Sequence, residues 1–193
     1  MVSLQGTTEV YDYQYTYLIP DLRSVHNIPK VENNSQTVLG FLQNNKDFSI
    51  FYNLVVRAKL EGKLSDTNYN STLLVAPNKS LADIDPNVFK NIDYYTAREL
   101  ILYNTLDKKV TESMLKSTRA QYLKTRIDKS VNSQILAEVC EDDSILLNEK
   151  VKITQPDLQR SNGLIHITDG ILVAYPFSSG GRFSLRPYVV CGY

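Results

Sequence analysis

Few residue patterns in this chain could support catalysis or metal binding, and each has a simpler structural interpretation. His166 lies three residues before Asp169, a pair that could act as acid and base or hold a metal ion. The chain has only one other histidine, His26, so such a centre would lack further ligands and partners. We therefore interpret His166 as a hydrogen-bonded structural histidine.

The remaining chemical candidates are equally sparse. The acidic run Glu141-Asp142-Asp143 could attract calcium, but a calcium site needs about six or more oxygen ligands in a shaped turn, so the run is interpreted as a solvated turn. Cys140 has no histidine near it in sequence, which favours a small buried side chain over a nucleophile. Gly180-Gly181-Arg182 lacks the Lys-Ser/Thr of a phosphate loop and is interpreted as a linker. The sequence thus predicts no catalytic residue, no metal site and no cofactor.

Composition limits the partners. The 193 residues, 42% of them hydrophobic, suffice for one domain with ordered arms. Twenty-one basic residues balance 21 acidic ones, so no net charge attracts nucleic acid, and no apolar run has membrane-spanning length. We expect neither nucleic-acid binding nor membrane insertion. The first twenty residues lack the pattern of a secretory signal, which predicts a chain that is not exported, with Cys140 and Cys191 reduced and not bonded to each other.

Three asparagines begin Asn-x-Ser/Thr triplets, the acceptor pattern for N-linked glycans. They are Asn33, Asn70 and Asn78. Such triplets are common by chance and are modified only on the secretory route. They bear on function only if the chain is exported, in which case a glycan on Asn70 would favour an extracellular protein.

Helical patterns dominate the first half of the central region. The first predicted helix begins near Thr37, and a second follows an N-cap at Asp47 and ends at Gly62. The segment Thr96-Ala97-Arg98-Glu99 fits a capping box that opens a third helix. A short helix is predicted from Thr111.

Strand patterns dominate the second half. The predicted strands, separated by turns at Asn148, Pro156, Asn162-Gly163 and Gly170, cover residues 72–76, 122–127, 134–139, 144–147, 151–154, 164–168 and 171–174. The first of them is closed by Pro77. Helices followed by strands without regular alternation predict an α+β domain.

Two arms flank the predicted domain. Residues 1–36 form an extended N-terminal arm, residues 37–176 the domain, and residues 177–193 a C-terminal arm that follows a Ser-Ser-Gly-Gly hinge. Alternation in the first arm places four tyrosines on one face of a strand, and the second arm carries two arginines and no acid. Strand addition to a partner and packing on the chain's own domain would give the same alternation. We expect partner contacts from Tyr11, Tyr13, Tyr15, Tyr17, Arg182, Arg186 and Tyr188.

The central region resembles the fasciclin domain. The resemblance covers residues 37 to about 173 and rests on two motifs in the family's order and spacing. One runs from Thr72 through Pro77 to Asn78, and the other is the segment Asn162-Gly163-Leu164-Ile165-His166. It implies a compact β-wedge or sandwich with packed helices, in which Thr72, Pro77, Tyr103, Asn162, Gly163 and His166 have structural roles.

The resemblance also implies a non-enzymatic role in adhesion or assembly. Family members that bind integrins use a tyrosine-histidine pair at the end of the middle helix, and the corresponding pair here is Tyr103-Asn104. Integrin binding through this pair is therefore not implied.

Three functions follow in order of preference. The first is a scaffold: similarity to fasciclin-like minor structural proteins of large DNA viruses implies a minor capsid component of a virion or intracellular assembly, bound to capsid or other protein subunits. The alternative is an extracellular or cell-surface adhesion protein. An enzyme comes third, because two histidines and no catalytic motif leave little from which to build an active site.

Overall fold

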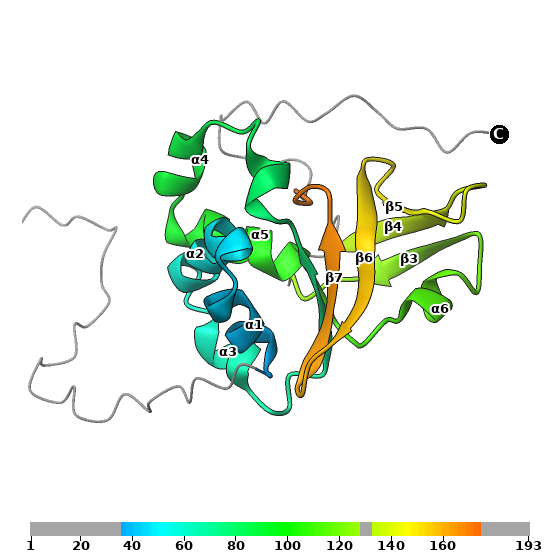
Figure 1. The fold of residues 1–193 in the computed structure, drawn as a ribbon, viewed down its shortest axis with the longest axis horizontal. Helices are drawn as coiled ribbons and strands as arrows, with labels where there is room; N and C mark the ends of the chain where they lie inside the picture. The colour runs from blue at the N-terminus through cyan, green and yellow to red at the C-terminus, as the bar shows by residue number, and fades with distance from the viewer. Residues whose placement is uncertain (1–35, 128–132, 175–193) are drawn as a thin grey trace, which may run out of the picture. The chain divides into compact units, whose positions relative to one another are not determined.

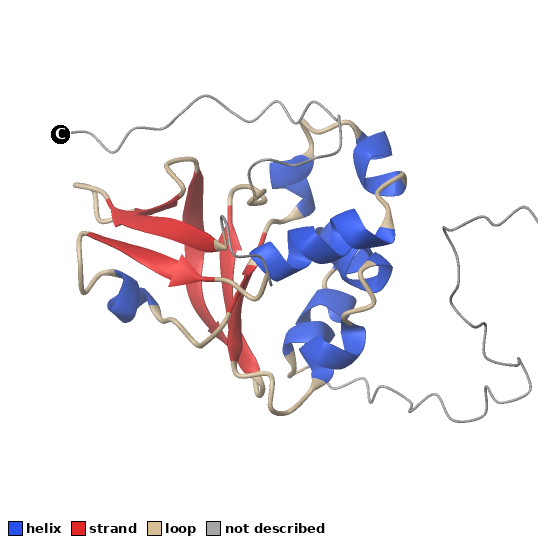
Figure 2. Cartoon of the chain, turned by 180° about the vertical axis from the view of Figure 1, so that it is seen from behind, coloured by secondary structure: helices blue, strands red, loops and turns tan. Residues whose placement is uncertain are grey.

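The computed structural model describes residues 36–127 and 133–174, which all lie in one compact unit. The α+β class expected from the sequence is confirmed. Helices α1 to α5 gather on one side of a seven-stranded sheet, and the short helix α6 lies apart from them among the strands (Figure 1 and Figure 2). The helical elements are α1 (Val38–Asn44), η2 (Lys46–Phe48), α2 (Ser49–Arg57), α3 (Glu61–Ser65), η3 (Asn78–Leu81), α4 (Pro86–Lys90), α5 (Tyr94–Tyr103) and α6 (Glu112–Leu115).

The strands follow the order β2-β1-β7-β6-β5-β4-β3 across the sheet. They are β1 (Ser71–Val75), β2 (Thr105–Leu106), β3 (Ala120–Lys124), β4 (Gln134–Val139), β5 (Ile145–Leu147), β6 (Val151–Gln159) and β7 (Gly163–Thr168). Only β1 and β7 pair in parallel, with Ser71 opposite Gly163 and Val75 opposite Ile167. All other neighbouring strands are antiparallel.

The two ends of the sheet meet. Leu106 of β2 forms an antiparallel bridge with Thr125, just after β3. The Asp107 N–H donates to the carbonyl of Lys124 at 3.0 Å, and the Arg126 N–H donates to the carbonyl of Thr105 at 2.8 Å. These bonds curl the sheet into a barrel-like wedge.

Each face of the sheet therefore covers its own hydrophobic core. Alternation along β1 sends Leu73 and Val75 toward the helices and Leu74 into the barrel. The helix-side core contains Val38, Leu39, Phe51, Leu54, Val55, Ala97, Ile101 and Ile165 among others, and the barrel core contains Leu106, Leu123, Ile135, Leu147 and Leu172 among others. Because both faces are covered, the run from Ser71 to Val75 is buried at every position.

Several predicted boundaries are wrong because tertiary contacts decide them. Asn45 caps the turn that contains Asp47, and α2 begins only at Ser49. The same helix ends at Arg57, since Lys59 takes φ of 52° and the Leu60 N–H reaches back to the Val55 carbonyl. Burial of Leu60 accompanies this turn.

Other corrections concern the start of α5 and the strands. The N-cap of α5 is Asp93, whose carboxylate accepts from the N–H groups of Tyr95 and Thr96, so the expected capping box at Thr96 is wrong. A hydrogen bond from the Thr96 hydroxyl at 2.6 Å, together with these backbone bonds, lowers the pKa of Asp93. Pro156 lies inside β6, at an irregularity in its register with β7, and residues 171–174 are not a strand.

Gly163 is needed at the start of β7 for a reason of space and not of backbone conformation. Neither Asn162 nor Gly163 adopts a positive φ, so no left-handed turn exists there. Instead, a Cβ on Gly163 would lie 2.8 Å from Cγ2 of Val38 and 2.9 Å from the carbonyl oxygen of Ser71. Gly163 is required because α1 and β1 approach the start of β7 too closely for any side chain.

Gly163→Ala should therefore lower the free energy of unfolding by about 1–3 kcal/mol, the usual cost of overpacking. Gly62→Ala is the matched control, because a Cβ there meets nothing within 4 Å and alanine favours the helix by about 0.5–1 kcal/mol. Urea denaturation of both variants measures the difference. Equal stability of the two variants would contradict the close-approach explanation.

Candidate functional site

The structure describes the residues that were predicted to hold the fold but not those that were predicted to contact partners. Tyr11, Tyr13, Tyr15, Tyr17, Arg182, Arg186 and Tyr188 all lie outside the described residues. The six residues expected to be structural are all described and buried: Thr72, Pro77, Tyr103, Asn162, Gly163 and His166. Their polar groups connect segments that are far apart in sequence.

Asn162 joins three helical or strand elements at one end of the sheet. Its Oδ1 accepts from the N–H of Val38 at the start of α1, at 2.9 Å. Its Nδ2 donates to the carbonyls of Leu64 and Asp66 at the end of α3, at 2.9 and 2.8 Å. The backbone carbonyl accepts from the N–H of Asn70. Loss of this side chain would leave buried donors and acceptors unpaired, which costs about 1–3 kcal/mol each.

Thr72 and His166 clamp the loop after β2 from two neighbouring strands. Thr72 Oγ1 accepts from the Val110 N–H at 2.9 Å and donates to the Lys108 carbonyl at 3.1 Å. His166 Nε2 lies 2.8 Å from the Val110 carbonyl oxygen. Val110 is thus held through both of its backbone groups, and its side chain enters the barrel core.

His166 is held as a neutral ring. Its Nδ1 accepts from the Asp157 N–H at 3.0 Å, so the proton sits on Nε2, which donates to Val110. Burial lowers the pKa of His166 below its ordinary 6.5, and this outweighs the nearby Val110 carbonyl and the Asp157 carboxylate, which favour the charged form. The Asp157 carboxylate itself accepts from the Glu112 N–H at 3.0 Å.

The imagined pair of His166 with Asp169 is not formed. Asp169 Oδ1 instead accepts from the Lys152 N–H at 2.8 Å. In the described part of the chain no three histidine, cysteine or acidic side chains are grouped to hold a metal. The acidic run is an exposed turn in which Asp142 accepts from the Ser144 N–H.

Tyr103 and Asn104, at the end of α5, are both buried. The Tyr103 hydroxyl donates to the Gln134 carbonyl and accepts from Asn148 Nδ2 at 3.0 Å, and burial raises the pKa of this tyrosine. Asn104 Oδ1 accepts from the Leu172 N–H at 3.0 Å, and its Nδ2 donates to the Leu172 carbonyl at 2.7 Å. The pair fastens the barrel strands and the segment after β7 to α5. It offers no surface for a partner.

The predicted state of Cys140 is wrong. Cys140 is disulfide-bonded, whereas the expected state was a reduced thiol. The chain's other cysteine, Cys191, lies outside the described residues. The number of cysteines and their separation in sequence carry no information about the distance between two sulfur atoms, so they could not predict the redox state of Cys140.

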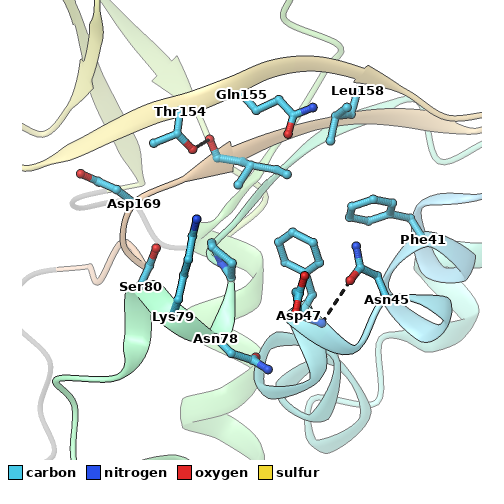
Figure 3. Close-up of a pocket in the computed structure, with 13 residues that line it drawn as sticks. Phe41, Asn45, Asp47, Asn78, Lys79, Ser80, Thr154, Gln155, Leu158 and Asp169 are labelled. Atoms are coloured by element: carbon cyan, nitrogen blue, oxygen red, sulfur yellow. Dashed lines mark hydrogen bonds between the residues drawn. The ribbon is translucent and has the colours of Figure 1, made fainter.

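A groove of about 850 Å³ opens between the helices and strands β6 and β7 (Figure 3). Phe41, Leu158 and Ile167 form a half-buried apolar floor, and the Phe41 and Phe48 rings pack with centroids 5.1 Å apart. Its other lining residues are Asn45, Asp47, Pro77, Asn78, Lys79, Ser80, Thr154, Gln155 and Asp169. The groove thus has an apolar floor, a polar rim and two carboxylates against one ammonium group.

Asn78 holds the two helical walls of the groove together. Its Oδ1 accepts from the Ile50 N–H at 3.0 Å, and its Nδ2 donates to the Lys46 carbonyl and to Ser49 Oγ. Such a surface can take up apolar side chains of an extended segment and hydrogen-bond its backbone. Ile167 is half-buried because it faces this groove.

Sequence reasoning missed the groove and the roles of Asn78, Asn104 and Asn148. The groove had no local signal, because its residues come from segments 41–48, 77–80, 154–158 and 167–169. Asn104 had one: an amide side chain between Tyr103 and the apolar strand that follows is buried and must be bonded.

A family model for the fasciclin domain matches residues 46–174. The chain belongs to the fasciclin domain family. Structural comparison agrees: a FAS1 domain pair from the insect cell adhesion molecule Fasciclin I matches with a TM-score of 0.58 and 22% identity, over 72% of this chain. The match spans 51% of the length of that domain-pair chain. A search of curated proteins found no match.

Fasciclin membership gives the motif residues a common meaning. The family's two motif strands are β1 and β7, the parallel pair of the sheet, and their polar residues bind loops rather than ligands. The family indicates a protein-interaction module of the adhesive kind, and neither comparison supports a capsid or virion role. Among the described residues, no helix is long and apolar enough to cross a bilayer.

The buried neutral His166 predicts acid sensitivity. Below pH 6.5 the unfolded chain binds a proton at this residue that the folded domain does not, so the free energy of unfolding should fall as pH drops from 7 toward 5. The slope should reach at most about 1.4 kcal/mol per pH unit. Urea denaturation across this range should show a shallower slope for His166→Gln than for the unmodified chain. His26→Gln is the control, and equal slopes for the unmodified chain and His166→Gln would contradict the assignment.

Proposed function

We propose that this fasciclin domain is an adhesive protein-interaction module that acts outside the cell or at a cell surface. The observation that carries the proposal is the family match across residues 46–174, which spans every strand and all of the groove residues except Phe41 and Asn45. The solved structure with the same fold comes from a protein described as an insect cell adhesion molecule.

The disulfide of Cys140 supports this location. Disulfide bonds persist in oxidising compartments and are rare where thiols are kept reduced. The first preference drawn from the sequence, an unexported scaffold in a virion, assumed reduced cysteines. The extracellular alternative therefore replaces it.

We infer that the groove is the contact surface. Its apolar floor suits an aromatic or aliphatic side chain, and Asp47 and Asp169 outnumber Lys79, which favours a basic residue beside that side chain. The sequence itself contains such a pattern at Arg182-Phe183 and at Arg186-Pro187-Tyr188. The proposed occupant is this C-terminal segment of a second copy.

Clustering of beads that carry the protein tests the proposal. Gln155→Arg places bulk and positive charge at the rim of the groove, from a side chain that is exposed, and should weaken clustering at least about tenfold, which corresponds to about 1.4 kcal/mol. The double variant Arg182→Glu and Arg186→Glu should do the same. Tyr122→Arg, at a position 70% exposed and outside the groove, is the matched control.

Three outcomes separate the parts of this proposal. Clustering that survives Gln155→Arg would exclude the groove as the contact. Loss with Gln155→Arg but not with the arginine variants would assign the groove to a different occupant. Beads that neither cluster nor attach to cell surfaces would contradict the adhesive function.

The N-terminal arm remains a second proposed contact, through its four tyrosines. Among the described residues, Gln36 accepts through its carbonyl from the Ser161 N–H, and Thr37 caps α1 through Gly40. Deleting residues 1–34 leaves these bonds in place, and we expect it to change the free energy of unfolding by less than about 0.5 kcal/mol. The same deletion should weaken bead clustering. Undiminished clustering would show that the arm is not a contact.

A further inference from the structure

The segment that enters β1 contains an N-glycan acceptor triplet, Asn70-Ser71-Thr72, in an unusual setting. Asn70 is exposed, whereas Ser71 and Thr72 are completely buried. The backbone of Asn70 has φ of 40°, a left-handed conformation that asparagine tolerates better than most residues, and its N–H donates to the Asn162 carbonyl at 2.9 Å. Within the described residues, the Asn70 side chain makes no hydrogen bond of its own.

The triplet at Asn78 differs at the side-chain amide nitrogen, the atom to which a glycan would be bonded. Both N–H groups of the Asn78 amide are in use, toward the Lys46 carbonyl at 3.0 Å and Ser49 Oγ at 2.9 Å. A glycan bonded to that nitrogen would replace one of these donors and place a bulky group inside the groove. Folding is therefore compatible with a glycan on Asn70 and opposes one on Asn78.

We propose that Asn70 carries an N-linked glycan. The inference rests on the proposed extracellular function, because only the secretory route supplies the donor, a lipid-linked oligosaccharide diphosphate. In the transfer a bond forms between Asn70 Nδ2 and the anomeric carbon of the sugar. The bond from that carbon to the diphosphate oxygen breaks, and the proton lost from the amide is taken up by the departing lipid diphosphate.

Folding fixes when the transfer takes place. The hydroxyl of the third residue, Thr72, belongs to the acceptor pattern, and in the folded domain it is bonded to Val110 and Lys108 and inaccessible. Transfer to Asn70 must precede the pairing of β1 with β7. After folding, the modified side chain stays in solvent while the rest of the triplet is sealed in the sheet.

The position also leaves the groove open. Asn70 immediately precedes β1, and the groove residues Pro77 to Ser80 follow its other end. A five-residue strand spans about 17 Å, so a glycan on Asn70 covers the end of the sheet away from these groove residues. The modification would direct partners to the groove rather than block it.

The experiment uses the full chain behind a cleavable secretion leader in eukaryotic cells, with intact mass measured before and after removal of N-linked glycans by an amidase. We expect the removal of a glycan from Asn70, with Asn70 converted to aspartate in the released peptide. Asn70→Gln and Asn70→Asp should each abolish it, and the second keeps a residue type that accepts the left-handed backbone. Asn78→Gln and Asn33→Gln should leave the glycan in place.

The outcomes separate this inference from the function on which it rests. Secreted protein with Cys140 disulfide-bonded but Asn70 unmodified would overturn the glycan site and leave the extracellular function standing. A glycan on Asn78 instead would overturn the structural argument as well. Failure to be secreted, with Cys140 reduced, would overturn the proposed extracellular function itself.

Discussion

The parallel pairing of β1 with β7 is the constraint on which the rest of the fold depends. It joins residues 71–75 to residues 163–167, about 90 positions apart, and leaves both faces of the sheet covered by apolar cores. The pair can form only because Gly163 has no side chain where Val38 and Ser71 approach it. A pairing of such long sequence separation gives no stability until most of the chain is in place, so its loop-closure entropy must be offset by the two cores and by the bonds that Thr72 and His166 make.

Buried or half-buried amide and imidazole side chains stabilise this fold by hydrogen bonds, where other folds would use a larger hydrophobic core. Three buried side chains, Asn162, Asn104 and His166, and the half-buried Asn78 each bind backbone groups of loops or helix ends. Each is bonded on both its donor and acceptor sides, so the cost of burying it is recovered. This arrangement fixes loops and helix ends without leaving a reactive group exposed. It also explains why motif residues of types that could serve in catalysis or metal binding have structural roles in the folded domain.

The groove is assembled from segments that are far apart in the sequence. The groove lies where β6 and β7 diverge from the helices, and its walls are joined by Asn78. Its floor contains Ile167 and Leu158, side chains that a closed core would bury fully. An apolar floor of this kind is maintained where a partner covers it. The oxidised state of Cys140 and the exposure of Asn70 agree with the proposed extracellular or cell-surface location.

The sequence by itself determined the α+β class, the strand 134–139 to the residue and the short helix near Thr111, because the apolar period is a local property. It also determined the family, through two motifs whose spacing is fixed by the β1–β7 pair. Tertiary structure decided the rest. Helix α2 ends at Arg57, ahead of Gly62, because the chain turns there and buries Leu60. Gly163 is required because neighbouring atoms leave no room for a side chain, and Cys140 is oxidised. The groove forms where four segments of the chain meet, and local sequence patterns do not specify which distant residues will share a surface.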